Sequence, residues 1–97
     1  MKLGRFTKTP VERKRYTIDY SDWLDTGETV LTVTFGVTPV TTNPLVVDAY
    51  LIATPATSVA YFVNDGIAGT TYTLDVQITT SGGQTKEDQV LYSVRDL

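Results

Sequence analysis

The chain has 97 residues and a formal net charge of −3, and it contains neither cysteine nor histidine. This length allows one domain with one hydrophobic core, and the missing residue types exclude a disulfide framework, a thiolate metal site and catalysis by a Ser-His or Cys-His pair. No apolar run approaches the roughly 18 residues of a membrane-spanning helix, so we expect no membrane partner. Threonine, with 18 residues, and valine, with 12, favour strands over helices.

Residues 1–14 combine a basic charge balance with the absence of any convincing periodicity. Six of the eight cationic residues, but only one of the eleven carboxylates, lie within residues 1–15. We interpret residues 1–14 as an extended basic arm and residues 15–97 as the β-sandwich domain. The arm is either a solvated tail or a segment that orders against a partner protein. In the second case its cations and two apolar anchors, together with the next residue, bind the partner: Lys2, Arg5, Phe6, Lys8, Val11, Arg13, Lys14 and Arg15.

The first predicted strand runs from Arg15 to Tyr20, with alternate residues facing the core. A compact loop follows over residues 21–27, in which we expect Ser21 to cap a single helical turn and Gly27 to close it. Trp23 in this loop is too apolar to be left in water by preference, so we expect it to cover an open end of the core. An exposed Trp23 would instead be a further partner-binding residue.

Two more strands are predicted over residues 28–37 and 45–53, with a loop that contains two prolines between them. In the first of these strands, the alternation places Leu31 and Val33 inward and Val30 outward. The second strand is apolar on both faces. This pattern indicates either a central strand or a strand whose outer face meets a partner.

The clearest pattern in the chain is a long β-hairpin over residues 67–97. Apolar residues alternate with polar ones before and after its turn: Tyr72, Leu74, Val76, Ile78, Val90, Tyr92 and Val94. Gly82 and Gly83 supply the positive φ angles that a tight reversal needs. Together with a turn over residues 54–57 and a short strand over residues 58–63, the hairpin completes six or seven strands. This number and spacing predict an all-β sandwich.

Candidate catalytic and metal-binding groups are few. Four carboxylates recur at every third position, which does not match the alternating ligands of a calcium loop: Asp19, Asp22, Asp25 and Glu28. Asp48 and Asp75 could serve acid–base chemistry only if a cleft held them together, and both are predicted to face outward. We therefore expect no enzyme, no cofactor and no metal. Nucleic acid is not an expected partner either, because a few cations on an acidic body would bind it weakly.

The stretch Gly69-Thr70-Thr71-Tyr72 resembles the tyrosine corner of fibronectin type III and related immunoglobulin-like domains. The resemblance implies an immunoglobulin-like (fibronectin type III-like) sandwich of antiparallel strands. It also implies that Tyr72 buries its ring at the edge of the sandwich and hydrogen-bonds to the backbone upstream. Tyr72 and Gly69 would then be structural residues, as would Gly82 and Gly83 of the hairpin turn.

A second resemblance extends along nearly the whole chain and is to small structural proteins of tailed bacteriophages, described as fiber–tail adaptors. The motifs that carry it are Lys8-x-Pro10-x-Glu12, Tyr16-x-x-Asp19-Tyr20-Ser21-x-x-Leu24, Gly27-Glu28-Thr29, Gly69-Thr70-Thr71-Tyr72, Ile78-Thr79-Thr80-x-Gly82-Gly83 and Val94-Arg95-Asp96. The resemblance implies a virion structural protein, made in the host cytoplasm, that joins the tail or neck to a tail fiber through its N-terminal arm. Its partners would be other phage structural proteins, and multiple copies in a symmetric assembly would strengthen each contact.

Two alternative functions stay open. A capsid decoration protein could use the same fold, and copies spread across the capsid, instead of at the tail alone, would indicate that role. A carbohydrate- or cell-surface-binding module would need exposed aromatic residues aligned on one surface, for which Trp23, Tyr50 and Phe62 are the candidates.

Overall fold

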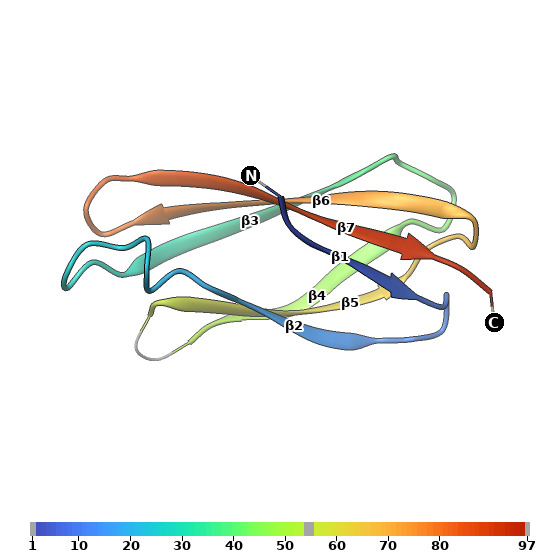
Figure 1. The fold of residues 1–97 in the computed structure, drawn as a ribbon, viewed down its shortest axis with the longest axis horizontal. Helices are drawn as coiled ribbons and strands as arrows, with labels where there is room; N and C mark the ends of the chain where they lie inside the picture. Colours follow the sequence, from blue (N-terminus) through green and yellow to red (C-terminus); the bar gives the residue numbers. More distant parts are fainter. Residues whose placement is uncertain (1, 54–55, 97) are drawn as a thin grey trace.

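The computed structural model describes residues 2–53 and 56–96 as two stacked β-sheets (Figure 1). These residues form seven strands: β1 Lys2–Lys8, β2 Lys14–Asp19, β3 Val30–Thr38, β4 Leu45–Ile52, β5 Ser58–Asp65, β6 Thr70–Thr80 and β7 Thr85–Val94. Within the described residues, no helix is long and apolar enough to cross a membrane. The predicted turn over residues 54–57 includes Thr54 and Pro55, which lie outside the described residues. The two sheets confirm the all-β sandwich that the sequence predicts.

One sheet has the strand order β1-β7-β6-β3, and the other has the order β2-β5-β4. Neighbouring strands are antiparallel, except that β1 and β7 run parallel. Figure 1 shows the two sheets as an upper and a lower layer. Apart from β1, the pairing follows the order of a constant-type immunoglobulin sandwich, in which strands B, E and D face strands G, F and C. The strand order therefore supports the immunoglobulin-like topology that the tyrosine-corner resemblance implies.

The hydrophobic core is built mainly from β5, β6 and β7, whose inward-facing side chains alternate with outward-facing ones. Nine of these inward apolar side chains are at most 1% exposed: Val59, Tyr61, Val63, Tyr72, Leu74, Val76, Ile78, Tyr92 and Val94. Burial of one large apolar side chain contributes about 1.5–3 kcal/mol to the free energy of unfolding. The hairpin pattern thus predicts both the strands and their buried face correctly.

The first two residues of β3 are arranged in the reverse of the predicted way. The pairing of β3 with β6 shifts between Val30 and Thr32, because a β-bulge sets two residues of one strand opposite one residue of the other. Val30 is therefore 3% exposed, whereas Leu31 is 58% exposed. Beyond the bulge the predicted phase is correct, since Val33 is buried.

β4 is an edge strand of its sheet, so the prediction of a central strand is wrong. Its pairing with β5 shifts between Asp48 and Leu51, and Ala49 in this bulge has a φ of 48°. The shift leaves Tyr50 and Leu51 more than half exposed. Because a bulge reverses the alternation, β4 is apolar on both faces without being buried on both.

Residues 2–8 form a strand of the four-stranded sheet, which differs from the predicted free arm. β1 lies along β7, from Gly4 opposite Val90 to Lys8 opposite Val94 (Figure 1). The N–H of Arg95 extends this pairing with a hydrogen bond of 2.9 Å to the carbonyl of Lys8. No period-two pattern marks β1 because its apolar residues stay partly exposed at the edge of the sheet. Pairing with a strand more than 80 residues away along the sequence stabilises it instead.

Candidate partner-binding site

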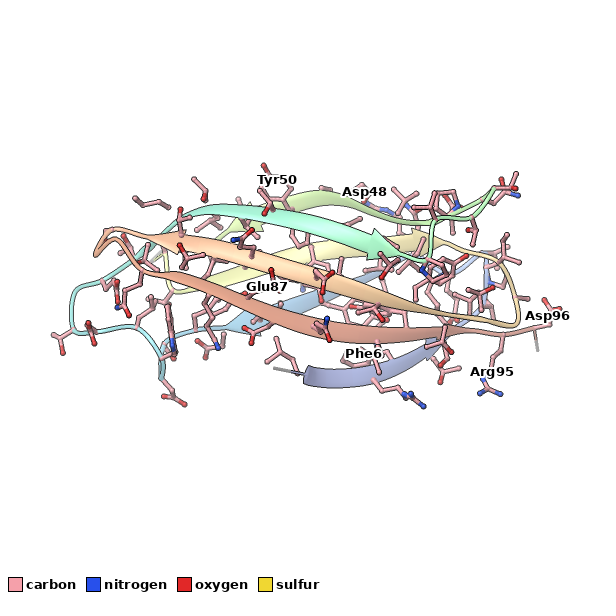
Figure 2. The ribbon with its side chains drawn as sticks, turned by 90° about the horizontal axis from the view of Figure 1, so that it is seen from above. Phe6, Asp48, Tyr50, Glu87, Arg95 and Asp96 are labelled. Carbon is pink, nitrogen blue, oxygen red and sulfur yellow. The ribbon has the colours of Figure 1, made fainter. Side chains whose placement is uncertain are left out.

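The segment that contains eight of the nine residues predicted to bind a partner runs along one long side of the sandwich. There the edge strands β1 and β2 of the two sheets face each other, and we call this the β1–β2 side. Figure 2 shows Phe6 on this side and Tyr50 on the opposite one. The eight residues lie on β1, on β2 or in the link between them: Lys2, Arg5, Phe6, Lys8, Val11, Arg13, Lys14 and Arg15. The structure therefore places the predicted segment at the edges of the two sheets.

Lys8 is a structural residue and not an exposed attachment charge. Its side chain is buried, and its Nζ donates hydrogen bonds to the carbonyls of Thr9 at 2.7 Å and Asp65 at 2.6 Å. Burial lowers the pKa of Lys8, and an ammonium in such surroundings needs acceptors of this kind. Lys8 thereby joins the end of β1 to the end of β5, which corrects the prediction of a freely available cation.

The link between β1 and β2 presents Val11 to solvent. Glu12 accepts the N–H of Thr9 through Oε1 at 2.6 Å and donates its own N–H to the Thr9 carbonyl at 3.2 Å. The first of these hydrogen bonds lowers the pKa of Glu12. The turn is thus held by its own residues, and Val11 at its tip is 91% exposed. An apolar side chain in this position is available to a partner.

Arg13 is engaged on the outer face of the three-stranded sheet. Its guanidinium lies 3.9 Å from the centre of the Phe62 ring and forms an ion pair of 2.9 Å with Asp48. Asp48 also accepts a hydrogen bond of 2.6 Å from Asn64. These contacts occupy much of the binding capacity of Arg13. Arg5, Lys14 and Arg15 are further exposed cations of the segment.

An aromatic cluster joins the two sheets on the β1–β2 side. The Phe6 ring of β1 lies 4.7 Å from that of Tyr16 in β2 and 5.6 Å from that of Tyr92 in β7. Tyr16 is in turn 6.0 Å from Tyr61, and the hydroxyls of Tyr61 and Tyr92 are hydrogen-bonded at 2.9 Å. Burial raises the pKa of Tyr16. Phe6 is still 40% exposed, so it both closes the core and contributes to the surface.

The edges of the two sheets leave a groove beside this cluster, with a volume of about 450 Å³. Apolar side chains form most of its lining, and every residue of β2 contributes to it: Leu3, Phe6, Lys14, Arg15, Tyr16, Thr17, Ile18, Asp19, Tyr61 and Val90. We call it the β1–β2 groove. It can receive an extended segment between two strand edges.

Trp23 is half-buried beside the far end of this groove. It packs against the core and lies 5.4 Å from the Nζ of Lys86. Lys86 forms an ion pair of 3.2 Å with Asp88, whose carboxylate is 1% exposed. This pair is not among the residues predicted from the sequence, although the hairpin alternation, continued backwards from Val90, already places residues 86 and 88 inward. Trp23 thus covers part of the core, and the rest of its side chain is exposed and available to a partner.

The β6–β7 turn is held by contacts that give its two glycines different roles. Gly83 has a φ of 79°, which is the positive value predicted for a tight reversal. The positive φ predicted for Gly82 is wrong, since its φ is not positive. Gly82 is needed for close approach instead, because a Cβ at this position would collide with the carboxylate of Glu28. That carboxylate accepts hydrogen bonds from the Thr80 hydroxyl and the Gln84 side chain, and these bonds, led by that of Thr80, lower the pKa of Glu28.

Tyr72 makes the contact that the tyrosine-corner resemblance implies. Its ring is completely buried, and its hydroxyl accepts the N–H of Ile67 at 3.0 Å. The same hydroxyl is hydrogen-bonded to that of Thr41 at 2.8 Å. Gly69, with a φ of 88°, donates its N–H to the Val94 carbonyl at 2.7 Å. Both residues therefore hold the end of the sandwich from which β6 begins.

The remaining carboxylates do not form a reactive pair. Asp48 lies on β4 and is bound to Arg13, whereas Asp75 lies on β6 in the other sheet and accepts a hydrogen bond of 2.9 Å from Gln89. Within the described residues, no group of three or more carboxylates is close enough to hold a metal ion.

Comparison with known proteins identifies a family and a similar fold. A family model described as "Podophage GP4 fiber-tail adaptor protein gp77" matches residues 8–93, which is most of the chain. No curated protein matches it. Among solved structures, the chain is similar to a 2,6-sialyltransferase of Vibrionaceae Photobacterium sp. JT-ISH-224, with a TM-score of 0.55 and 10% identity. The match covers 98% of this chain but 17% of that one, and at this identity it concerns the fold alone.

Proposed function

We propose, from the premise that the chain belongs to the podophage GP4 fiber-tail adaptor family, that it attaches to a partner through the exposed cations of the β1–β2 side. Family membership makes the protein a virion component that joins tail and fiber proteins. The proposal concerns the surface through which the protein contacts these partners. Exposed charge on such a surface steers association and selects a partner of opposite charge.

The observation that supports this proposal is that the segment with the exposed cations also carries exposed apolar side chains. Arg5 and Lys14 are exposed on the edge strands β1 and β2, and the partly exposed Phe6 and the exposed tip residue Val11 belong to the same segment. Protein interfaces combine apolar anchors with a charged rim in this way. Lys8 and Arg13 are instead engaged by other residues of the protein.

We further propose that the protein has no catalytic role, in line with a family of structural adaptors. The carbohydrate-binding alternative loses support, because its three candidate aromatic residues contact three different parts of the molecule. Tyr50 lies against Phe35 of β3, Phe62 lies under the guanidinium of Arg13, and Trp23 lies near Lys86 of β7. Assembly in multiple copies and production in the host cytoplasm remain part of the proposal.

The test is neutralisation of two exposed cations, Arg5 on β1 and Lys14 on β2, of which Lys14 also places its Nζ 5.8 Å from the centre of the Tyr16 ring. Deletion of residues 1–14 is unsuitable, because it would remove β1 from its sheet. We expect the double variant Arg5→Gln, Lys14→Gln to fold normally and to enter virus particles about tenfold less efficiently, as quantified by mass spectrometry of purified particles.

A matched control changes the net charge equally on another surface. The variant Thr42→Glu, Gln77→Glu alters two exposed residues and also lowers the net charge by two. We expect it to be incorporated like the natural protein. Equal incorporation of the Arg5/Lys14 variant and the natural protein would disprove attachment through these cations.

A further inference from the structure

We propose that β2 is a self-pairing edge, through which two copies of the chain form an antiparallel dimer centred on Thr17. Within the described residues, β2 pairs with β5 alone, because β1 belongs to the other sheet. One side of β2 is therefore open along its length, and an open edge of this kind is a template for another strand. The inference concerns contacts between copies, and it is tested at Arg15, Thr17 and Asp19, whereas attachment to a partner is tested at Arg5 and Lys14.

The backbone of β2 shows which residues are available for this pairing. The N–H of Tyr20 donates to the carbonyl of Thr57 at 2.8 Å, so the polar backbone groups of Tyr20 point toward the β5 side. The register between β2 and β5 is continuous, and in an antiparallel pair these groups alternate between the two sides of a strand. Arg15, Thr17 and Asp19 therefore direct their N–H and carbonyl groups to the open edge.

The side chains of β2 complement a second copy of the same strand. In an antiparallel pair centred on Thr17, Arg15 of each copy lies opposite Asp19 of the other, and Tyr16 lies opposite Ile18. Arg15 and Asp19 are both exposed, and directly opposite residues share one face of a sheet, so two ion pairs form across the junction. A register shifted by two residues would set Arg15 opposite Thr17 and lose both pairs.

The groove favours a second copy over other strands. Arg15 begins the open edge with a positive charge and Asp19 ends it with a negative one, so an antiparallel copy satisfies both charges. A cationic strand such as β1 of another copy would be repelled by Lys14 and Arg15. A purely acidic segment would leave Asp19 opposite a like charge. Asp19 accepts the N–H of Ser21 at 2.9 Å through Oδ1, which leaves its second carboxylate oxygen for the partner's arginine.

A single cysteine tests this geometry directly, because the chain contains none of its own. Thr17 would lie opposite its own copy, with a Cα–Cα distance of about 5.5 Å, which a disulfide can bridge. We expect Thr17→Cys to form a covalent dimer under mild oxidation, read by non-reducing electrophoresis. The matched control is Thr34→Cys on β3, an exposed position on the edge strand of the other sheet. We expect it to cross-link at the background level.

Charge exchange supplies a second measurement that does not depend on cysteine chemistry. We expect the natural protein to show twice its monomer mass of 10.7 kDa by light scattering at high concentration. Arg15→Asp or Asp19→Arg alone should raise the dissociation constant about tenfold or more, and the two together should restore it. A monomer at all concentrations, cross-linking of Thr17→Cys no greater than that of Thr34→Cys, or a double variant as weak as the singles would overturn the proposal.

Discussion

The β6–β7 hairpin and the β1–β2 side are stabilised in different ways. The inward side chains of the hairpin are almost completely removed from water, and its turn is held by a hydrogen-bonded carboxylate. The β1–β2 side depends on one buried lysine, a ring cluster that bridges two sheets and a self-contained turn. Arg5, Lys14, Arg15 and the tip residue Val11 remain exposed. The comparison indicates that the hairpin maintains the fold, while the β1–β2 side is shaped by that fold and is free to bind.

The largest expected effect lies in the hairpin. Leu74 is completely buried in β6, so Leu74→Ala removes buried methyl groups and leaves a cavity. We expect a loss of about 2–5 kcal/mol in the free energy of unfolding, measured by chemical denaturation. A loss below about 0.5 kcal/mol would show that the hairpin does not carry the core.

The turn of the hairpin provides the next test. Gly82→Ala places a Cβ against the Glu28 carboxylate, which its hydrogen bonds hold in place. We expect a destabilisation of about 1–3 kcal/mol. Gly36→Ala is the matched control, because a Cβ there meets nothing within 4 Å and its φ is not positive. Similar denaturation midpoints for the two variants would contradict the role assigned to Gly82.

Lys8 tests whether the β1–β2 side contributes to stability at all. Lys8→Met keeps much of the apolar stem but leaves the carbonyls of Thr9 and Asp65 without the ammonium that serves them. We expect a loss of about 1–3 kcal/mol in the free energy of unfolding. Hydrogen exchange should show the loss of protection concentrated in β1 and in the end of β5. An unchanged free energy of unfolding would show that the hydrogen bonds of Lys8 do not stabilise the fold.

The pH dependence of stability reports on Glu28. Its pKa is lower in the folded chain than in the unfolded one, so its contribution is complete above the unfolded value and is lost as the pH falls through the folded value. We expect the thermal midpoint to decrease between about pH 5 and pH 3, and Glu28→Gln to decrease less over this range. Parallel curves for the two proteins would assign the acid sensitivity to other carboxylates.

The smallest expected effect is on the surface that we propose to bind. Arg5→Gln with Lys14→Gln alters exposed side chains only, so the free energy of unfolding should change by about 0.5 kcal/mol or less. Chemical denaturation of the variant provides this value. A larger loss would mean that these cations stabilise the fold. The β1–β2 side would then maintain the fold as the hairpin does.

Local sequence patterns predicted most of the body of the sandwich. The hairpin, β5 and the later part of β3 follow a period of two, because each has one face in the core and one in water. The tyrosine corner was also predictable, since Tyr72 contacts a backbone N–H five residues away. The errors at Val30, Leu31 and β4 have one common origin. A bulge reverses the alternation of a strand, and it depends on the partner strand more than on the residues themselves.

The sequence by itself determined the sandwich, its core strands and the clustering of cations near the N-terminus, since these follow from periodicity and composition. The tertiary structure alone decided that β1 joins β7, that Lys8 is buried against Asp65 and that Lys14 and Arg15 line a groove beside the open edge of β2. The physical reason is one of distance. Alternation is a property of neighbouring residues, whereas the pairing of an edge strand and the burial of a charge depend on residues that only folding brings into contact.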